Sequence, residues 1–228
     1  MSRNKNSVPD KPQFYGRRKG HALRPHRQLL MAELLPLLEV SAEGKYELEA
    51  AEIWLEIGFG AGDHLAAQAE SHPDIGFIGC EPYVNGIATL LSVIEQKKLN
   101  NIRLFNDDAR LLLTNLEPAS ISKVFVLFSD PWPKKRHNRR RFINPENLAA
   151  LAEIMTDQAE LRFATDDMSY IRWALDVFYR HPDFTWRVQG PADWRHRYAD
   201  TAPTRYETKA LKQGKKCVYL TFQRQARS

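Results

Sequence analysis

Short, almost wholly apolar runs recur along this chain, and segments with helical patterning separate them. The runs with strand character are residues 53–57, 75–80, 102–105, 121–128, 161–164 and 217–222. The segments with helical character are residues 25–39, 63–71, 84–97 and 168–179, a short helix after Asp107-Asp108, and a helix that begins at Asn144-Pro145-Glu146. Strands that alternate with helices in this way indicate an α/β fold with a mostly parallel sheet, covered on both faces. In such a fold the ligand site lies at the carboxyl ends of the strands.

The length of 228 residues, with 43% hydrophobic and 27% charged residues, suits one α/β domain. The most apolar early stretch, residues 29–40, is interrupted by two glutamates and a proline, so it predicts an amphipathic helix and no membrane span. No apolar core follows the basic N-terminus, so no signal peptide is predicted. Cys80 and Cys217 lie far apart in the sequence, which favours a reducing, cytoplasmic location.

Positive charge is concentrated in two segments of the chain. Residues 1–27 carry eight Lys or Arg against one Asp, and residues 134–141 carry six and no acid. The net charge is only +5, so the remaining chain is acidic overall. Basic patches on an acidic body indicate a directed site for a polyanion. We expect residues 1–25 to form a basic, disordered tail, which either contacts RNA or acts as a solubilising tail, and residues 26–228 to form a single domain.

One predicted strand is followed directly by an acid, an aromatic residue and a run of cations. The strand at 121–128 is followed by Asp130-Pro131-Trp132-Pro133 and then by the basic run 134–141. A carboxylate can bond a polar base edge, an aromatic ring can stack, and cations can hold phosphates, so the combination suits chemistry on a nucleic-acid base. Two alternatives stay open here: Trp132 stacks on a base or braces the loop, and the basic run holds RNA or is a solvated surface loop or a localisation-like string.

A glycine-rich turn follows the first predicted strand. Gly58, Gly60 and Gly62 let backbone N–H groups approach a ligand closely. The dinucleotide fingerprint G-x-G-x-x-G is not met, because Asp63 stands where its third glycine would be. The spacing therefore disfavours a nicotinamide oxidoreductase.

Carboxylates stand at the ends of successive predicted strands. Glu56 precedes the glycines and suits a cationic ligand group, whereas Glu81 is placed to bond a ribose diol. Asp108 follows the third strand and could accept a bond from an adenine amino group. Asp130 and Asp166 follow the fourth and fifth strands, so five carboxylates share one predicted rim. The alternative is that strand ends are simply often polar.

These glycines and carboxylates resemble those of the class I S-adenosylmethionine-dependent methyltransferases, over about residues 53–222. The resemblance implies a Rossmann-like, doubly wound, seven-stranded sheet with an antiparallel C-terminal strand. It also implies S-adenosyl-L-methionine as cofactor, with Glu56 and the segment Gly58–Gly62 at its methionine part. Glu81 then faces the ribose, Asp108 the adenine and Asp130 the methyl donor. The histidines show no metal-ligand spacing, and no metal is expected.

Three further segments, 129–141, 164–167 and 204–207, are similar to motifs of the bacterial tRNA (guanine-N7-)-methyltransferases, the TrmB family. Ser129 stands where that family usually has proline. The resemblance implies that Asp130 is catalytic. It implies substrate contacts for Lys134, Asp166, Thr204, Arg205, Tyr206 and Glu207. It implies RNA contacts for Arg136, His137, Asn138, Arg139, Arg140 and Arg141.

The chemistry of guanine makes this assignment physically reasonable. N7 carries an in-plane lone pair and loses no proton when it attacks a methyl group, so orientation and electrostatics matter more than a general base. The resulting hypothesis is methyl transfer to N7 of guanine 46 in the variable loop of tRNA, with Asp130 orienting the base. The partner is tRNA, no membrane is involved, and the protein is a monomer or a homodimer.

Two other classes of function stay open. One is a methyltransferase for another substrate, because Asp130-Pro131-Trp132 distantly resembles the [DNS]-P-P-[YFW] motif of amino-group methylases. The other is a nucleic-acid-binding module with a vestigial cofactor fold. Intact carboxylates at the four positions Glu56, Glu81, Asp108 and Asp130 argue against the second class.

Overall fold

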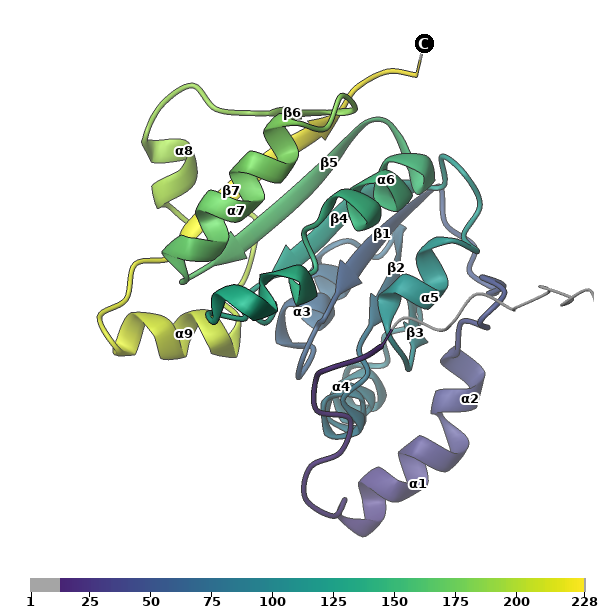
Figure 1. Cartoon of the computed structure of the whole chain (residues 1–228). Coiled ribbons are helices and arrows are strands. Elements are labelled where there is room, and N and C mark those ends of the chain that lie inside the picture. Colours follow the sequence, from purple (N-terminus) through teal and green to yellow (C-terminus); the bar gives the residue numbers. More distant parts are fainter. Residues whose placement is uncertain (1–12, 228) are drawn as a thin grey trace, which may run out of the picture.

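A seven-stranded sheet lies at the centre of the computed structural model, which describes residues 13–227, and helices cover both faces (Figure 1). The strands are β1 (Glu52–Ile57), β2 (Ile75–Cys80), β3 (Ile102–Phe105), β4 (Ile121–Leu127), β5 (Met155–Thr165), β6 (Phe184–Trp186) and β7 (Val218–Arg224). The helices are α1 (Pro25–Glu33), α2 (Leu35–Leu38), α3 (Asp63–Ser71), α4 (Val84–Lys97), α5 (Ala109–Leu113), α6 (Pro145–Ile154), α7 (Met168–Tyr179), α8 (Ala192–Arg195) and α9 (Arg205–Lys212). A 3₁₀ helix, η1, spans Lys135–Arg140.

The strand order is β3-β2-β1-β4-β5-β7-β6, and only β7 runs against the others. This confirms the predicted α/β, mostly parallel, doubly wound sheet with an antiparallel C-terminal strand. The chain winds from β1 outward to β3, then returns to the centre and winds the other way from β4. The carboxyl ends of β1 and β4 therefore flank the switch point, where ligands bind in such folds.

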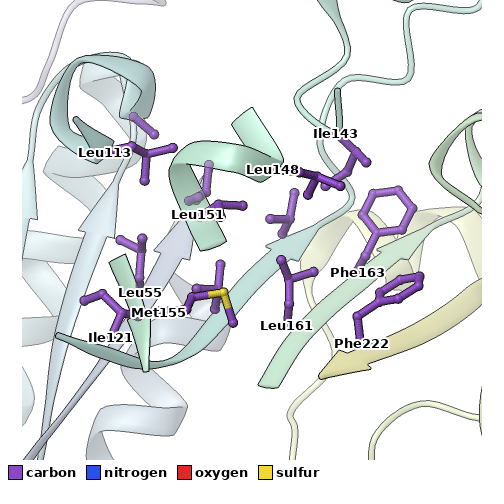
Figure 2. Close-up of a cluster of buried hydrophobic side chains, with 14 of the residues drawn as sticks. Leu55, Leu113, Ile121, Ile143, Leu148, Leu151, Met155, Leu161, Phe163 and Phe222 are labelled. Atoms are coloured by element: carbon purple, nitrogen blue, oxygen red, sulfur yellow. The ribbon is translucent and has the colours of Figure 1, made fainter. Parts of the chain in front are cut away.

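The two faces of the sheet bury separate hydrophobic cores. One core packs α5, α6 and α7 on the sheet, and the other packs α1, α3 and α4 on the opposite face. Figure 2 shows Leu148 and Leu151 of α6 directed at the strands, near Leu161 and Phe163, and all four side chains are fully buried. Each such side chain stabilises the fold by roughly 1.5–3 kcal/mol relative to an exposed one. These cores hold the strand ends, and so the site, in place.

Several elements differ from the sequence prediction, which did not include the helices α8, α9 and η1. The single helix expected over 25–39 is wrong: it divides into α1 and α2, because Pro36 has no N–H to continue the helical bonds. The fifth strand is longer than expected and begins at Met155, directly after α6. The edge strand β6, Phe184–Trp186, was not predicted, since three residues are too short for a recognisable alternating pattern.

Residues 13–24 form no helix or strand, but they contact the domain. The Val84 backbone N–H donates to the Arg18 carbonyl at 2.9 Å, and Asn85 Oδ1 accepts from the Gly20 N–H at 2.8 Å. Arg18 also pairs with Asp107, with 2.6 Å between Nη2 and Oδ1. The segment therefore crosses the ends of β2 and β3. Residues 1–12 of the predicted disordered tail lie outside the described residues, and the boundary between tail and domain at residue 25 stays a prediction.

Within residues 13–227, no helix has both the length and the apolar character that crossing a bilayer requires.

Candidate active site

A cavity of about 410 Å³ lies at the carboxyl ends of β1 to β4. A volume of this size suits a small-molecule ligand. Its walls come from the glycine turn, the loops after β2, β3 and β4, the N-terminal segment and α9. Among the residues that line it are Tyr15, Gly58, Gly60, Glu81, Asp108, Arg110, Asp130, Trp132, Arg139, Arg140, Arg141 and Tyr206.

The glycine turn requires backbone conformations that other residues rarely adopt. Gly58, Gly60 and Gly62 have φ of +73°, +60° and +79°. A Cβ on Gly58 would meet no atom within 4 Å, so its missing side chain leaves open space. Close packing fixes the other side of the turn, because a Cβ on Gly86 of α4 would lie 2.1 Å from the Gly60 carbonyl oxygen. The turn therefore packs tightly against α4 at Gly60 and borders open space at Gly58.

Glu81 holds the turn from the end of β2. Its Oε2 accepts a hydrogen bond from the Gly60 N–H at 2.7 Å, and its Oε1 accepts from the Tyr83 N–H at 2.9 Å. Burial raises the pKa of the Glu81 carboxyl, the nearby Asp130 and Glu56 charges raise it further, and the two backbone bonds act in the opposite direction. Each oxygen keeps a second lone pair, so the side chain can still accept from a ligand hydroxyl. The contact of Glu81 with a ribose stays a prediction.

Glu56 does not line the cavity. Its buried Oε2 lies 2.7 Å from Nδ1 of His64, a residue of α3 that is also buried. His64 Nε2 has no hydrogen-bond partner among the described residues. The carboxylate is thus paired inside the protein behind the turn, and its predicted contact with a methionine group stays untested.

Asp108 lines the cavity from the start of α5. Its Oδ1 caps the helix by accepting from the Arg110 N–H at 3.1 Å, and the Arg110 Nε lies 3.0 Å from both carboxylate oxygens. Arg110 Nη2 also donates to the Gln13 carbonyl at 3.0 Å. Arg110, which was not predicted as a site residue, joins Asp108 to the N-terminal segment, and the adenine contact of Asp108 stays a prediction.

Asp130 is exposed at the cavity rim, just beyond β4. Its carboxylate has no hydrogen-bond or ion-pair partner in residues 13–227, and partial desolvation raises its pKa. The backbone on either side is unusual: Phe128 has φ of +53° and Trp132 has φ of +45°, in the region that favours glycine. Strained residues of this kind cost about 1–3 kcal/mol each and cluster at functional sites. Asp130 is therefore an unpaired acid on a strained loop at the switch point.

Trp132 packs within the loop. Its ring meets those of Tyr15 and His137 edge-on, at centroid distances of 6.2 and 5.9 Å, and the Arg140 guanidinium lies 5.0 Å from its centroid. The same guanidinium lies 3.8 Å from the Tyr15 ring centroid. Trp132 thus braces the loop in this structure, and stacking on a base stays a prediction.

The basic loop divides into exposed and buried parts. Lys134, Lys135, Arg136 and Arg139 are exposed, and His137, Asn138 and Arg140 are half-buried. Partial desolvation and the surrounding cations lower the pKa of His137. Arg141 is only 1% exposed, and its predicted RNA contact stays a prediction. The predicted contacts of the other residues stay untested.

The predicted substrate motif 204–207 divides in a similar way. Thr204 caps α9, accepting from the Glu207 N–H at 3.0 Å, and Arg205 pairs with Asp63. Tyr206 lines the cavity, and its ring lies 3.2 Å from where a Cβ on Gly60 would be. Glu207 is buried and accepts from the Tyr219 hydroxyl at 2.6 Å. Only Tyr206 of this motif reaches the main cavity.

Lys134 and Asp166 lie outside the cavity lining. Lys134 is exposed, while Asp166 forms an ion pair with Lys215, with 2.6 Å between Nζ and Oδ2. The substrate contacts predicted for both residues stay untested. In residues 13–227, no three His, Cys, Asp or Glu side chains are grouped closely enough to hold a metal ion.

The sheet order, the glycine turn after β1 and the carboxylates after β2, β3 and β4 define a class I S-adenosylmethionine-dependent methyltransferase. Solved structures agree at the level of the fold. The antibiotic-resistance methyltransferase Kmr superposes with a TM-score of 0.55 at 18% identity, covering 78% of this chain and 89% of that chain. The 16S rRNA methyltransferase KamB gives 0.53 at 13% identity, covering 79% and 95%.

Sequence comparison identifies the family. Residues 50–220 match a family model described as a putative methyltransferase. A tRNA (guanine-N(7)-)-methyltransferase of Rhodospirillum rubrum is 46% identical over 97% of this chain and 92% of its own length. Its counterpart in Paramagnetospirillum magneticum is 45% identical over 98% of both chains. The chain therefore belongs to the tRNA (guanine-N7-)-methyltransferase family.

Proposed function

We propose that this protein transfers a methyl group from S-adenosyl-L-methionine to N7 of a guanine in tRNA, at position 46 of the variable loop. The observation that carries the proposal is the position of Asp130. This carboxylate, unpartnered in the described part of the chain, stands where the cavity meets the basic loop. The names of the relatives support the substrate class.

The lining of the cavity fits this cofactor. The open space in front of Gly58 can take a ligand close to the backbone, and Glu81 and Asp108 offer acceptors for hydroxyl and amino groups. Bound S-adenosylmethionine would supply an electrophilic methyl group on a positively charged sulfur. Glu81 and Asp130 form no ion pair among residues 13–227 and favour positive charge next to them, whereas Asp108 is paired with Arg110. We assign Asp108 to the adenine end, Glu81 to the ribose, and the glycine turn, with Glu56 behind it, to the methionine end.

Asp130 orients the guanine and stabilises charge. Its carboxylate can accept from the N1–H and the amino group on one edge of the base, which leaves the opposite edge, with N7, free to face the methyl donor. Methylation makes the base cationic, and a partly desolvated carboxylate favours that charge. No proton leaves N7, so Asp130 need not act as a base.

The exposed cations of the basic loop hold the RNA backbone. Among residues 13–227, no carboxylate forms an ion pair with any of the four exposed cations, Lys134, Lys135, Arg136 and Arg139. Free cations next to a reactive site are suited to phosphate contacts. A tRNA substrate also places the protein in the cytoplasm, and both a monomer and a homodimer are compatible with this role.

Methyl transfer to unmodified tRNA tests the proposal. We expect labelled methyl groups to enter a transcript that contains G46, and borohydride and aniline treatment to cleave it at that nucleotide. A transcript with adenine at position 46 should take up no label. Label without cleavage, or equal labelling of both transcripts, would show a methyltransferase with another target atom or site.

A further inference from the structure

Arg141 ends the basic run but does not belong to its exposed surface. Its side chain is among the largest that are fully buried, whereas Arg139, two residues earlier, is exposed. A buried guanidinium costs several kcal/mol of desolvation, which an apolar side chain of the same size would avoid. We therefore expect the charge of Arg141 and its hydrogen bonds to act inside the protein.

The Arg141 guanidinium joins two loops. Its Nε donates to the Pro131 carbonyl at 2.7 Å, directly after Asp130. Its Nη1 and Nη2 donate to the Ser169 carbonyl and hydroxyl at 3.1 and 2.6 Å, at the start of α7. The Ser169 hydroxyl in turn donates to Asp167 Oδ1 at 2.6 Å. The Arg141 guanidinium also lies over the ring of Tyr170, with 5.0 Å between the guanidinium carbon and the ring centroid.

The two joined loops carry Asp130, which lines the cavity, and Asp166, which is paired with Lys215 outside the cavity lining. Asp130 precedes Pro131, and Asp166 precedes Asp167. Apart from the packing of Trp132, the first loop has few hydrogen bonds to hold it: proline donates none, and Trp132 has a positive φ of +45°. A donor from outside the loop can hold this conformation, and Arg141 supplies one.

We propose that Arg141 is a positioning residue, which fixes the Asp130 loop against the start of α7 and makes no contact with RNA phosphate. The inference rests on the proposed function, because Asp130 is assigned to the guanine there. A misplacement of about 1 Å at a reacting centre can lower a rate by on the order of 100-fold.

The variants Arg141→Lys and Ser169→Ala test this in the full chain with tRNA. Ser169→Ala removes one link between the loops without burying a charge, so it stays informative if Arg141→Lys folds poorly. We expect the single-turnover rate at saturating tRNA to fall about 100-fold in Arg141→Lys and about 10-fold in Ser169→Ala. The salt dependence of tRNA binding should not change. Arg139→Ala is the comparison, in which the slope against salt should become shallower by about one.

Hydrogen exchange supplies a readout that needs no substrate. The amides of Phe128 and Tyr170, which donate hydrogen bonds to Ala164 and Asp167 beside the two joined loops, should exchange faster in both variants than in the wild type, while those of α3 should not change. Leu151→Ala is the stability control: it lowers the melting temperature through the core but should leave exchange at Phe128 and Tyr170 as in the wild type. A shallower salt slope in Arg141→Lys, or unchanged exchange at both amides, would overturn the positioning role. Failure of wild-type protein to methylate tRNA would instead overturn the proposed function, and the exchange result would still stand.

Discussion

Arg205 and Asp63 form an ion pair, with 2.7 Å between Nε and Oδ2, that joins the first turn of α9 to the first turn of α3. Asp63 follows the glycine turn directly, so the pair brings the C-terminal motif to the cavity. Tyr206, the next residue, then closes over Gly60. Residues 142 positions apart in the sequence thus form one wall of the site.

Gly60→Ala should disturb that wall. The new Cβ would lie 3.2 Å from the Tyr206 ring, and φ of +60° is unfavourable for alanine. We expect cofactor affinity, measured by calorimetry, to fall at least 10-fold, and stability to fall by about 1 kcal/mol or more. Gly190→Ala is the matched control, because its Cβ would meet nothing within 4 Å and its φ is not positive. Equal affinities in both variants would show that the turn does not face the cofactor.

Asp130→Asn should separate chemistry from binding. The amide keeps the size of the side chain but loses the negative charge that favours a cationic product. We expect the single-turnover rate at saturating tRNA and cofactor to fall about 100-fold, and calorimetry measures any loss of cofactor affinity separately. A near wild-type rate would exclude the electrostatic role.

The pH dependence of the chemical step should report the protonation of the Asp130 carboxyl. Desolvation raises its pKa, so the carboxyl keeps its proton to a higher pH than an ordinary aspartate. Because the anion is the active form, the rate is full above this raised pKa and is lost as the pH falls through it. The acid limb of the single-turnover profile should therefore lie above that of an unperturbed aspartate, and Asp130→Asn should abolish it. Glu81, whose pKa burial also raises, should instead affect cofactor affinity.

Glu207→Gln should act on stability more than on substrate. Glu207 is 2% exposed and accepts a charge-assisted bond from Tyr219. Loss of the charge should lower the free energy of unfolding by about 1–3 kcal/mol in a denaturant titration. Tyr219→Phe, which removes the donor from the same bond, should give a loss of similar size. A stable Glu207→Gln protein that no longer binds tRNA would support the substrate contact that its motif predicted.

Tyr15→Ala should weaken cofactor binding. Tyr15 lines the cavity and lies under the Arg140 guanidinium, so its loss opens one wall and frees the arginine. We expect the dissociation constant to rise several-fold, in line with a cation–π contact of about 0.5–2 kcal/mol. Tyr179→Ala is the control, because Tyr179 is 91% exposed. Unchanged binding in Tyr15→Ala would show that the N-terminal segment does not enclose the cofactor.

The sequence by itself determined the sheet, the glycine turn and the rim of acids. Strand and helix patterns are local properties: apolar runs such as 121–128, when they alternate with helical segments, favour a parallel sheet covered on both faces. Once the strands are known, their carboxyl ends share one edge, so five acids were predicted to lie at one rim. Glu81, Asp108 and Asp130 line the cavity, whereas Glu56 and Asp166 do not.

Only the tertiary structure decided which charges are exposed. Arg139 and Arg141 look alike in the sequence, yet one is exposed and the other is buried against Ser169, 28 residues away. In the same way, Glu207 is directed inward by Tyr219. The physical reason is that the position of a charged side chain depends on whether distant segments supply partners for it. Local sequence patterns predict which apolar faces are buried, but they do not show which distant residues bind a charged side chain.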